Sequence, residues 1–94
     1  MPEVVAEFSV TPMVDGPVTP FIDTAIEEIE SAGLNYEVGA MGTTVEGNLD
    51  QVLDAIKRAH EAVLSKGAER VVTEIRIDEK KGGISMNEEL EGFR

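Results

Sequence analysis

Alternating apolar and polar residues mark the first and last regular segments of the chain as β-strands. Every second residue is apolar in VVAEFSVTPM (residues 4–13), and ERVVTEIRID (residues 69–78) follows nearly the same alternation. A period of two is typical of a strand with one buried face. The positions predicted to face the core are Val4, Ala6, Phe8 and Val10 in the first strand, and Val71, Thr73, Ile75 and Ile77 in the last.

Two longer segments repeat apolar residues at three- and four-residue spacing, which predicts helices packed on one side. In the first, Thr19 is the expected N-cap and Pro20 the first helical residue, and Gly33 ends the helix. In the second, Asn48 is the expected N-cap, with Gln51 completing a capping box, and Gly67 ends the helix. The apolar stripes are Phe21, Ile22, Ala25, Ile26, Ile29 and Ala32, then Leu49, Val52, Leu53, Ile56, Ala59, Val63 and Leu64.

Between the helices, residues 35–41 and 43–47 are predicted to form a hairpin with Gly42 close to its turn. The element order is therefore βαββαβ. This order predicts an α+β, ferredoxin-like sandwich: a four-stranded antiparallel sheet with two helices on one face. We assign residues 1–80 to this single domain. Residues 81–94 have weak periodicity and adjacent glycines, and the alternatives for this tail are a mobile extension and an arm that docks on a partner.

Composition narrows the class of partner. The 94 residues carry 19 acidic against 8 basic side chains, a net charge of −11, which argues against binding to nucleic acid or to an anionic membrane. Cysteine is absent, so disulfides and thiolate chemistry are excluded. No apolar run approaches the roughly 20 residues of a membrane span, and the N-terminus does not resemble a signal peptide. The expected location is cytoplasmic, and a cationic or neutral ligand fits the charge best.

Strand parity assigns a set of polar side chains to the sheet face that the two helices leave open. Glu7 and Ser9 point to this face from the first strand, Thr44 and Glu46 from the third, and Arg76 from the last. Val5, Val72 and Met41 are expected on the same face. Self-association would bury them and enclose an acidic, hydroxyl-lined pocket for a small cationic molecule. The alternative is a sheet face that is simply solvated.

Catalytic and metal sites have weaker support. Glu7 and Glu46 could form an acid–base pair, but with 19 acidic residues chance proximity is the simpler interpretation. A single histidine, His60, makes a transition-metal site improbable and fits a hydrogen-bonded histidine at the edge of a core better. GAMGTT (residues 39–44) lacks the lysine ending of a phosphate-binding loop, and no serine stands in a GxSxG context. We predict neither a cofactor nor an enzyme.

Four segments together resemble the small thiamine-binding protein family, whose members are related to bacterial proteins that bind thiamine or its hydroxymethylpyrimidine moiety. They are SVTP (9–12), SAGLNYEV (31–38), MGTTVEG (41–47) and ERVVTEIRID (69–78). The resemblance covers about residues 3–80, and the GTTVEG segment is its sharpest mark. The chain departs from the family pattern at Ala40, where a proline is usual, and at Lys80-Lys81, where an arginine is common.

The resemblance implies a ferredoxin-like fold, homodimers or homotetramers, and non-catalytic binding of thiamine or a related pyrimidine. Matched to the family motifs, Ser9, Thr44 and Glu46 would be polar ligand contacts and Met41 a wall of the site. Glu7 and Arg76 join them from strand parity. The runner-up is a structural or regulatory oligomerisation module without a small-molecule ligand.

Overall fold

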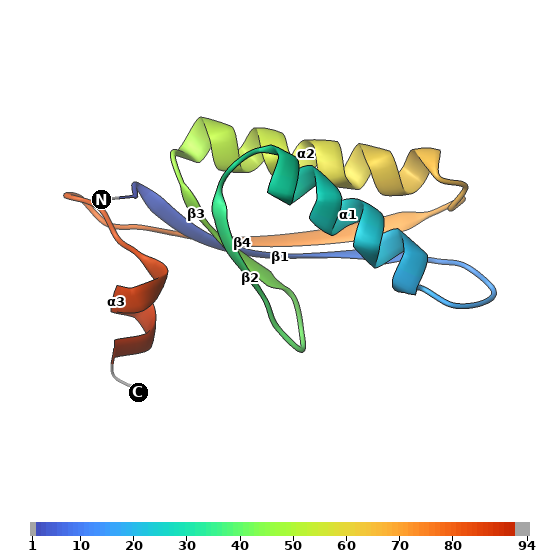
Figure 1. The fold of residues 1–94 in the computed structure, drawn as a ribbon, viewed down its shortest axis with the longest axis horizontal. Helices are drawn as coiled ribbons and strands as arrows, with labels where there is room; N and C mark the ends of the chain where they lie inside the picture. Colours follow the sequence, from blue (N-terminus) through green and yellow to red (C-terminus); the bar gives the residue numbers. More distant parts are fainter. Residues whose placement is uncertain (1, 92–94) are drawn as a thin grey trace.

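The computed structural model describes residues 2–91, which form a four-stranded antiparallel sheet with two long helices on one face and a short helix on the other (Figure 1). In chain order the elements are β1 (Val4–Pro12), α1 (Thr19–Ser31), β2 (Asn35–Val38), β3 (Thr43–Gly47), α2 (Leu49–Ser65), β4 (Val71–Glu79) and α3 (Met86–Leu90). The strand order β2-β3-β1-β4 puts the first and third strands in the centre. The predicted ferredoxin-like α+β sandwich is confirmed.

The strand register confirms the parity predicted for the central strands. Val5 pairs with Glu46 and Glu7 with Thr44, so these four side chains share one face of the sheet. Across the other edge of β1, Glu7 pairs with Arg76 of β4. The face opposite to these residues carries Val4, Ala6, Phe8 and Val45, all of which are buried.

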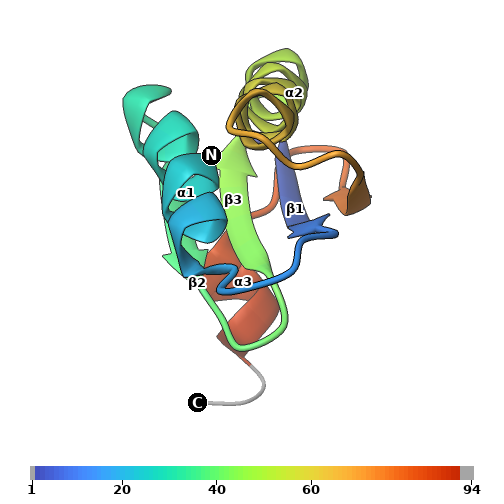
Figure 2. The same cartoon turned by 90° about the vertical axis from the view of Figure 1, so that its right-hand side faces the viewer.

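One core cluster fills the space between the sheet and the two long helices (Figure 2). Ile29 of α1 and Ile56 of α2 are among its largest fully buried side chains. Each long helix contributes its apolar stripe, as predicted, but not to the stripe's full width. Leu53 and Leu64 of α2 are 39% and 45% exposed because they stand at the margin of the buried face. Ile75 and Ile77 are also more than 40% exposed because β4 is an edge strand.

The N-cap residue predicted for α2 is confirmed, and the one predicted for α1 is not. Asn48 caps α2, because its side-chain oxygen accepts hydrogen bonds from the backbone N–H groups of Asp50 and Gln51 (2.9 and 3.4 Å). At α1 the prediction for Thr19 was wrong. The cap residue is Val18, whose carbonyl accepts from Phe21 and Ile22, and Thr19 already lies inside the helix, with no side-chain cap.

The second strand is shorter than predicted. β2 ends at Val38, and the backbone N–H of Gly39 donates to the carbonyl of Gly42 (2.8 Å), closing a loop over residues 39–42. Met41 therefore lies in this loop, 88% exposed, and not on the open sheet face where it was expected. The strand predicted over residues 35–41 stops early because Gly39 and Gly42 close a turn within and just after it.

Residues 84–90 pack against this chain's own sheet, an arrangement that the sequence did not indicate. Ile84 and Met86 form a small buried cluster with Val5, on the face opposite to α1 and α2 (Figure 1). The Ile84 N–H also donates to the carbonyl of Pro2 (2.9 Å). The helix-free face is thus partly covered, and α3 borders the area that remains open.

Candidate functional site

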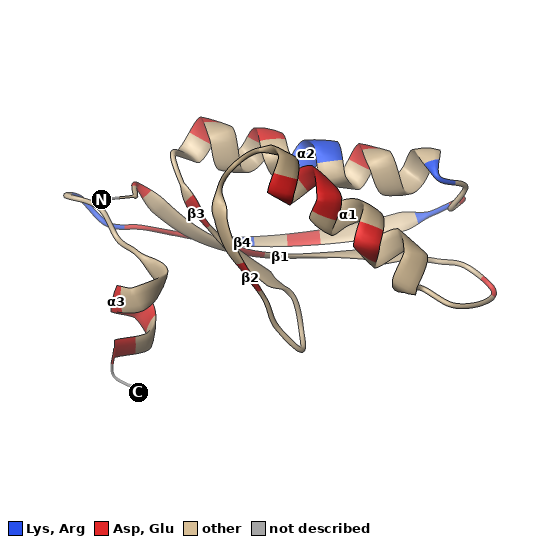
Figure 3. Ribbon diagram, in the orientation of Figure 1, with Lys and Arg blue, Asp and Glu red and all other residues tan. Residues whose placement is uncertain are grey.

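A groove of about 410 Å³ lies on the outer face of the sheet, beside α3. Its floor comes from the strands and one wall comes from α3. The lining residues are Val5, Glu7, Glu37, Val38, Gly39, Thr44, Arg76, Ile77, Asp78, Met86, Glu89 and Leu90. Four of these are acidic and one is basic. The groove therefore shares the excess of acidic over basic residues that the whole chain has (Figure 3).

A row of polar side chains crosses all four strands of the groove floor. Glu37 pairs with Thr44, Thr44 with Glu7, and Glu7 with Arg76. Arg76 Nη1 lies 3.9 Å from Glu7 Oε1, and the Arg76 side chain is 88% exposed. An exposed ion pair at this distance contributes little stability, since water competes for both groups. The row therefore keeps its hydrogen-bonding capacity available to a ligand.

Two acidic residues, Asp78 on β4 and Glu89 on α3, line the groove together. Glu89 hydrogen-bonds to Asp78 of β4, and two carboxyl groups can share a hydrogen bond only when one of them holds a proton. This bond raises the pKa of Glu89. Partial desolvation and the negative charges of Asp78 and Glu88 raise it further.

Glu46 lies at the N-terminal end of α3 and has structural partners. Its Oε1 accepts a hydrogen bond from Asn35 Nδ2 (2.7 Å), and its Oε2 accepts one from the backbone N–H of Met86 (3.1 Å). It does not line the groove. Glu7 and Glu46, considered from the sequence as an acid–base pair, have different partners: Arg76 for the first, Asn35 and Met86 for the second.

Ser9 and Met41 line a different cavity, of about 300 Å³, between α1 and the loop at residues 39–42. Val38 and Gly39 border both this cavity and the groove. Of the six predicted site residues, the structure thus brings Glu7, Thr44 and Arg76 together. It places Ser9 and Met41 in the neighbouring cavity and Glu46 at the N-terminal end of α3.

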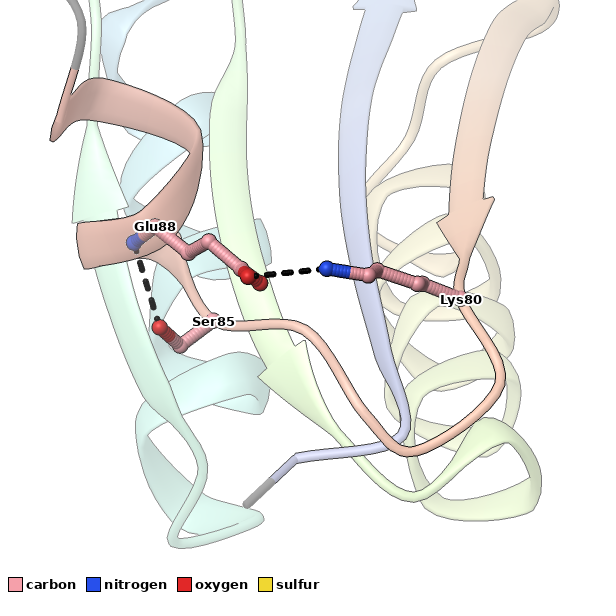
Figure 4. Close-up of polar contacts among 3 residues, drawn as sticks. All are labelled: Lys80, Ser85 and Glu88. Atoms are coloured by element: carbon pink, nitrogen blue, oxygen red, sulfur yellow. Dashed lines mark hydrogen bonds and ion pairs between the residues drawn. The ribbon is translucent and has the colours of Figure 1, made fainter.

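Sequence reasoning missed the groove residues Glu37, Met86 and Glu89. Parity along β2 could have found Glu37, which stands opposite Thr44. The α3 residues also had a signal, because Ser85 and Glu88 in SMNE have the spacing of a helix start. Ser85 is indeed the cap of α3, accepting a hydrogen bond from the Glu88 N–H (3.2 Å; Figure 4).

Other kinds of site find little support in the part of the chain that the structure describes. Residues 2–91 contain no group of three or more His, Cys, Asp or Glu side chains placed to hold a metal ion. His60 Nδ1 lies 2.7 Å from Thr73 Oγ1, so the one histidine has a partner on the helix-covered side. Within the same range, no helix has the length and apolar character needed to cross a bilayer.

The docking of α3 should depend on pH through Glu89. A carboxyl whose pKa is raised on folding stabilises below its unfolded pKa, and this stabilisation is lost as pH rises through the folded pKa. We therefore expect α3 to dock less firmly toward neutral pH, which the Met86 methyl resonance would report in a titration from about pH 4 to pH 8. The effect should be small, because Glu89 is exposed.

Glu89→Gln provides the control for this titration. Its amide can donate to Asp78 at any pH, so the Met86 shift should lose most of its pH dependence. If the Met86 resonance of the variant followed the same pH curve as that of the wild type, its pH dependence would come from a group other than Glu89.

Both the sequence and the fold of this chain match known proteins. A sequence model of the family described as "Thiamine-binding protein" matches residues 6–93. The chain belongs to this family. The match continues through the C-terminal segment, so residues 81–93 are part of what the family shares, beyond the range of about 3–80 suggested by the sequence motifs.

Relatives of this chain include UPF0045 proteins of different organisms. The chain is 44% identical over 73 residues to a UPF0045 protein of Clostridium perfringens, covering 78% of this chain and 77% of the relative. It is also 44% identical over 82 residues to a UPF0045 protein of Methanocaldococcus jannaschii, covering 86% of this chain and 81% of the relative.

Solved structures of similar proteins have the same fold. A Bacillus cereus domain of unknown function is 41% identical, with a TM-score of 0.91, covering 99% of this chain and 91% of the other. A proposed thiamine biosynthesis/salvage protein of Thermotoga maritima is 39% identical, with a TM-score of 0.88, covering 99% of this chain and all of the other. Family and fold together support a general binding role.

Proposed function

We propose that this protein binds thiamine or a related pyrimidine in the groove beside α3, without catalysing a reaction on it. The acidic lining of the groove is the observation that carries the proposal. Four carboxyl groups, those of Glu7, Glu37, Asp78 and Glu89, face one guanidinium, that of Arg76. The volume of about 410 Å³ falls in the range of sites for small organic ligands.

The chemistry of thiamine suits such a lining. Its thiazolium ring carries a positive charge, which nearby carboxylates stabilise, and its aminopyrimidine presents hydrogen-bond donors and acceptors at one edge. The carboxylate of Glu7, the hydroxyl of Thr44 and the guanidinium of Arg76 offer both kinds of partner in a row. Val5 and Met86 supply apolar surface against a ring face.

The other three candidate residues, Ser9, Met41 and Glu46, do not line the groove itself. Ser9 and Met41 contact a ligand only if it extends past Gly39 into the neighbouring cavity. Glu46 contacts Met86, which is itself a groove residue.

Self-assembly into a homodimer or homotetramer is the second part of the proposal. β4 is an edge strand of nine residues, and Val72, Ile75 and Ile77 on it are 36–43% exposed. Unpaired edges with apolar side chains favour pairing with another chain. The same observation favours the alternative function, an oligomerisation module with no ligand, which predicts an assembly whose groove is packed dry.

Calorimetric titration tests the proposal directly. We expect thiamine and hydroxymethylpyrimidine each to release or absorb measurable heat and to raise the melting temperature of the protein. No heat and no thermal shift with either compound would reject the binding function and leave the oligomerisation module.

The same titration on Glu7→Gln tests the role of charge. The variant loses a carboxylate and leaves Arg76 without its partner, so binding of cationic thiamine should weaken by roughly threefold to tenfold. Neutral hydroxymethylpyrimidine should be affected less. Glu27→Gln is the matched control, since Glu27 is exposed on α1, away from the groove. Equal weakening of both ligands in Glu7→Gln would contradict the electrostatic argument.

A further inference from the structure

The groove depends on α3 for its depth. Met86, Glu89 and Leu90 are the groove residues that come from this helix, and the strands provide the rest. Because a sheet surface is nearly flat, its residues alone do not enclose a small molecule. A ligand of the groove therefore meets the complete site only while α3 is docked.

The helix has little means of staying docked by itself. It contains five residues, far fewer than the roughly 12–15 that an isolated helix needs to be even marginally stable in water. Its connection to β4 contains Gly82 and Gly83, with φ values of +92° and +100°, a backbone conformation that glycine adopts without steric cost. Its apolar anchor is the three-residue cluster of Val5, Ile84 and Met86, separate from the main core.

Polar contacts also keep α3 against the sheet. Lys80 Nζ lies 3.0 Å from Glu88 Oε1, so the start of the connection, just after β4, is joined to the helix (Figure 4). This pair is open to water, with side chains that are 59% and 35% exposed, so its contribution is modest.

Glu46 makes the contact that is best placed to hold the helix. It lies on β3, a central strand, and Asn35 of β2 fixes one of its oxygens. The other oxygen accepts from the N–H of Met86, the first residue of α3. That N–H has no partner inside the helix, and the bond is partly buried and involves a charged acceptor, which makes it stronger than a neutral one.

We propose that Glu46 is a positioning residue: it holds α3 against the sheet, and ligand binding in the groove is thereby coupled to the docking of α3. The coupling to a ligand rests on the proposed binding function. The docking role rests on the contacts of Glu46 alone. It gives the glutamate of the GTTVEG segment a role at a groove that this residue does not line. A ligand that contacts Met86, Glu89 or Leu90 stabilises the docked helix, and docking in turn raises affinity for the ligand.

The test combines amide hydrogen exchange of residues 84–90 with thiamine titration of the full chain. In the wild type, thiamine should slow exchange in this segment. Glu46→Ala should speed it without changing exchange in β1 and β3, and should weaken thiamine binding about tenfold, as expected for loss of a charged hydrogen bond. Gly82→Ala should do the same from outside the groove, because an alanine side chain is strained at a φ of +92°.

Glu46→Gln separates positioning from direct contact with a cation. Its amide oxygen can still accept from the Met86 N–H, so it should recover most of the protection and most of the affinity that Glu46→Ala loses. Weak binding with α3 still protected would mean that Glu46 touches the ligand, and would overturn the inference.

Two further outcomes separate this inference from the proposed function. Loss of α3 protection in Glu46→Ala and Gly82→Ala with wild-type affinity for thiamine would overturn the coupling and leave the binding function intact. Absence of thiamine binding in the wild type would overturn the proposed function and the coupling with it. Exchange measured without ligand still decides whether Glu46 holds the helix, and unchanged protection in Glu46→Ala would overturn that role.

Discussion

Ile56→Ala should lower the free energy of unfolding by about 2–5 kcal/mol, which is a large part of the stability of a small domain. Ile56 is 1% exposed and belongs to the core cluster between α2 and the sheet. Alanine would remove three carbon atoms from a site with no access to water, and the surrounding strands could close only part of the cavity. Urea unfolding followed by far-UV circular dichroism would measure the loss.

Leu53→Ala is the matched control on the same helix. Leu53 is 39% exposed, so it loses less buried surface and leaves no closed cavity. We expect a loss of roughly 1 kcal/mol or less. Equal losses from the two substitutions would contradict the placement of the core under α2.

Gly42→Ala should damage both stability and the groove. A Cβ atom at this position would lie 2.9 Å from the backbone oxygen of Phe8 and 3.3 Å from Cγ of Glu7. The carbonyl belongs to β1, a central strand, and cannot move without disturbing the sheet. We expect a loss of about 1–3 kcal/mol from overpacking, together with weaker thiamine binding because the Glu7 side chain is displaced.

Urea unfolding and calorimetric titration of the same variant would check both effects. Ala40→Ser is the control, since Ala40 is exposed in the same loop and the change should stay within about 0.5 kcal/mol. If Gly42→Ala changed the free energy of unfolding and thiamine binding as little as the control does, the close packing of Gly42 against β1 would be contradicted.

The fold could be predicted from the sequence because its helix caps and its strand alternation depend on residues that are close together in the chain. Asn48 has a side chain that can cap a helix start, and the alternation around Glu7 puts every second residue on one face. These preferences act over a few residues and survive in any arrangement of the remaining chain. The prediction was weaker at Thr19 and Met41, where the exact ends of an element depend on hydrogen bonds made by neighbouring backbone groups.

The candidate site was only partly visible in the sequence. Glu7, Thr44 and Arg76 were found by parity, because strand pairing brings them into one row. The wall at α3 was not found, since it results from contacts between residues about 40 positions apart, such as Glu46 with Met86.

The stretch AMGTTVEGN (residues 40–48) illustrates what the sequence determines and what the tertiary structure adds. By itself the sequence determined that the chain turns near Gly42, that Thr44 and Glu46 share a strand face, and that Asn48 starts a helix. Only the tertiary structure decided that Thr44 borders a groove while Glu46 bonds to the first turn of α3. The physical reason is that side-chain direction is set by local backbone geometry, whereas a partner is set by which distant segment packs against that side chain.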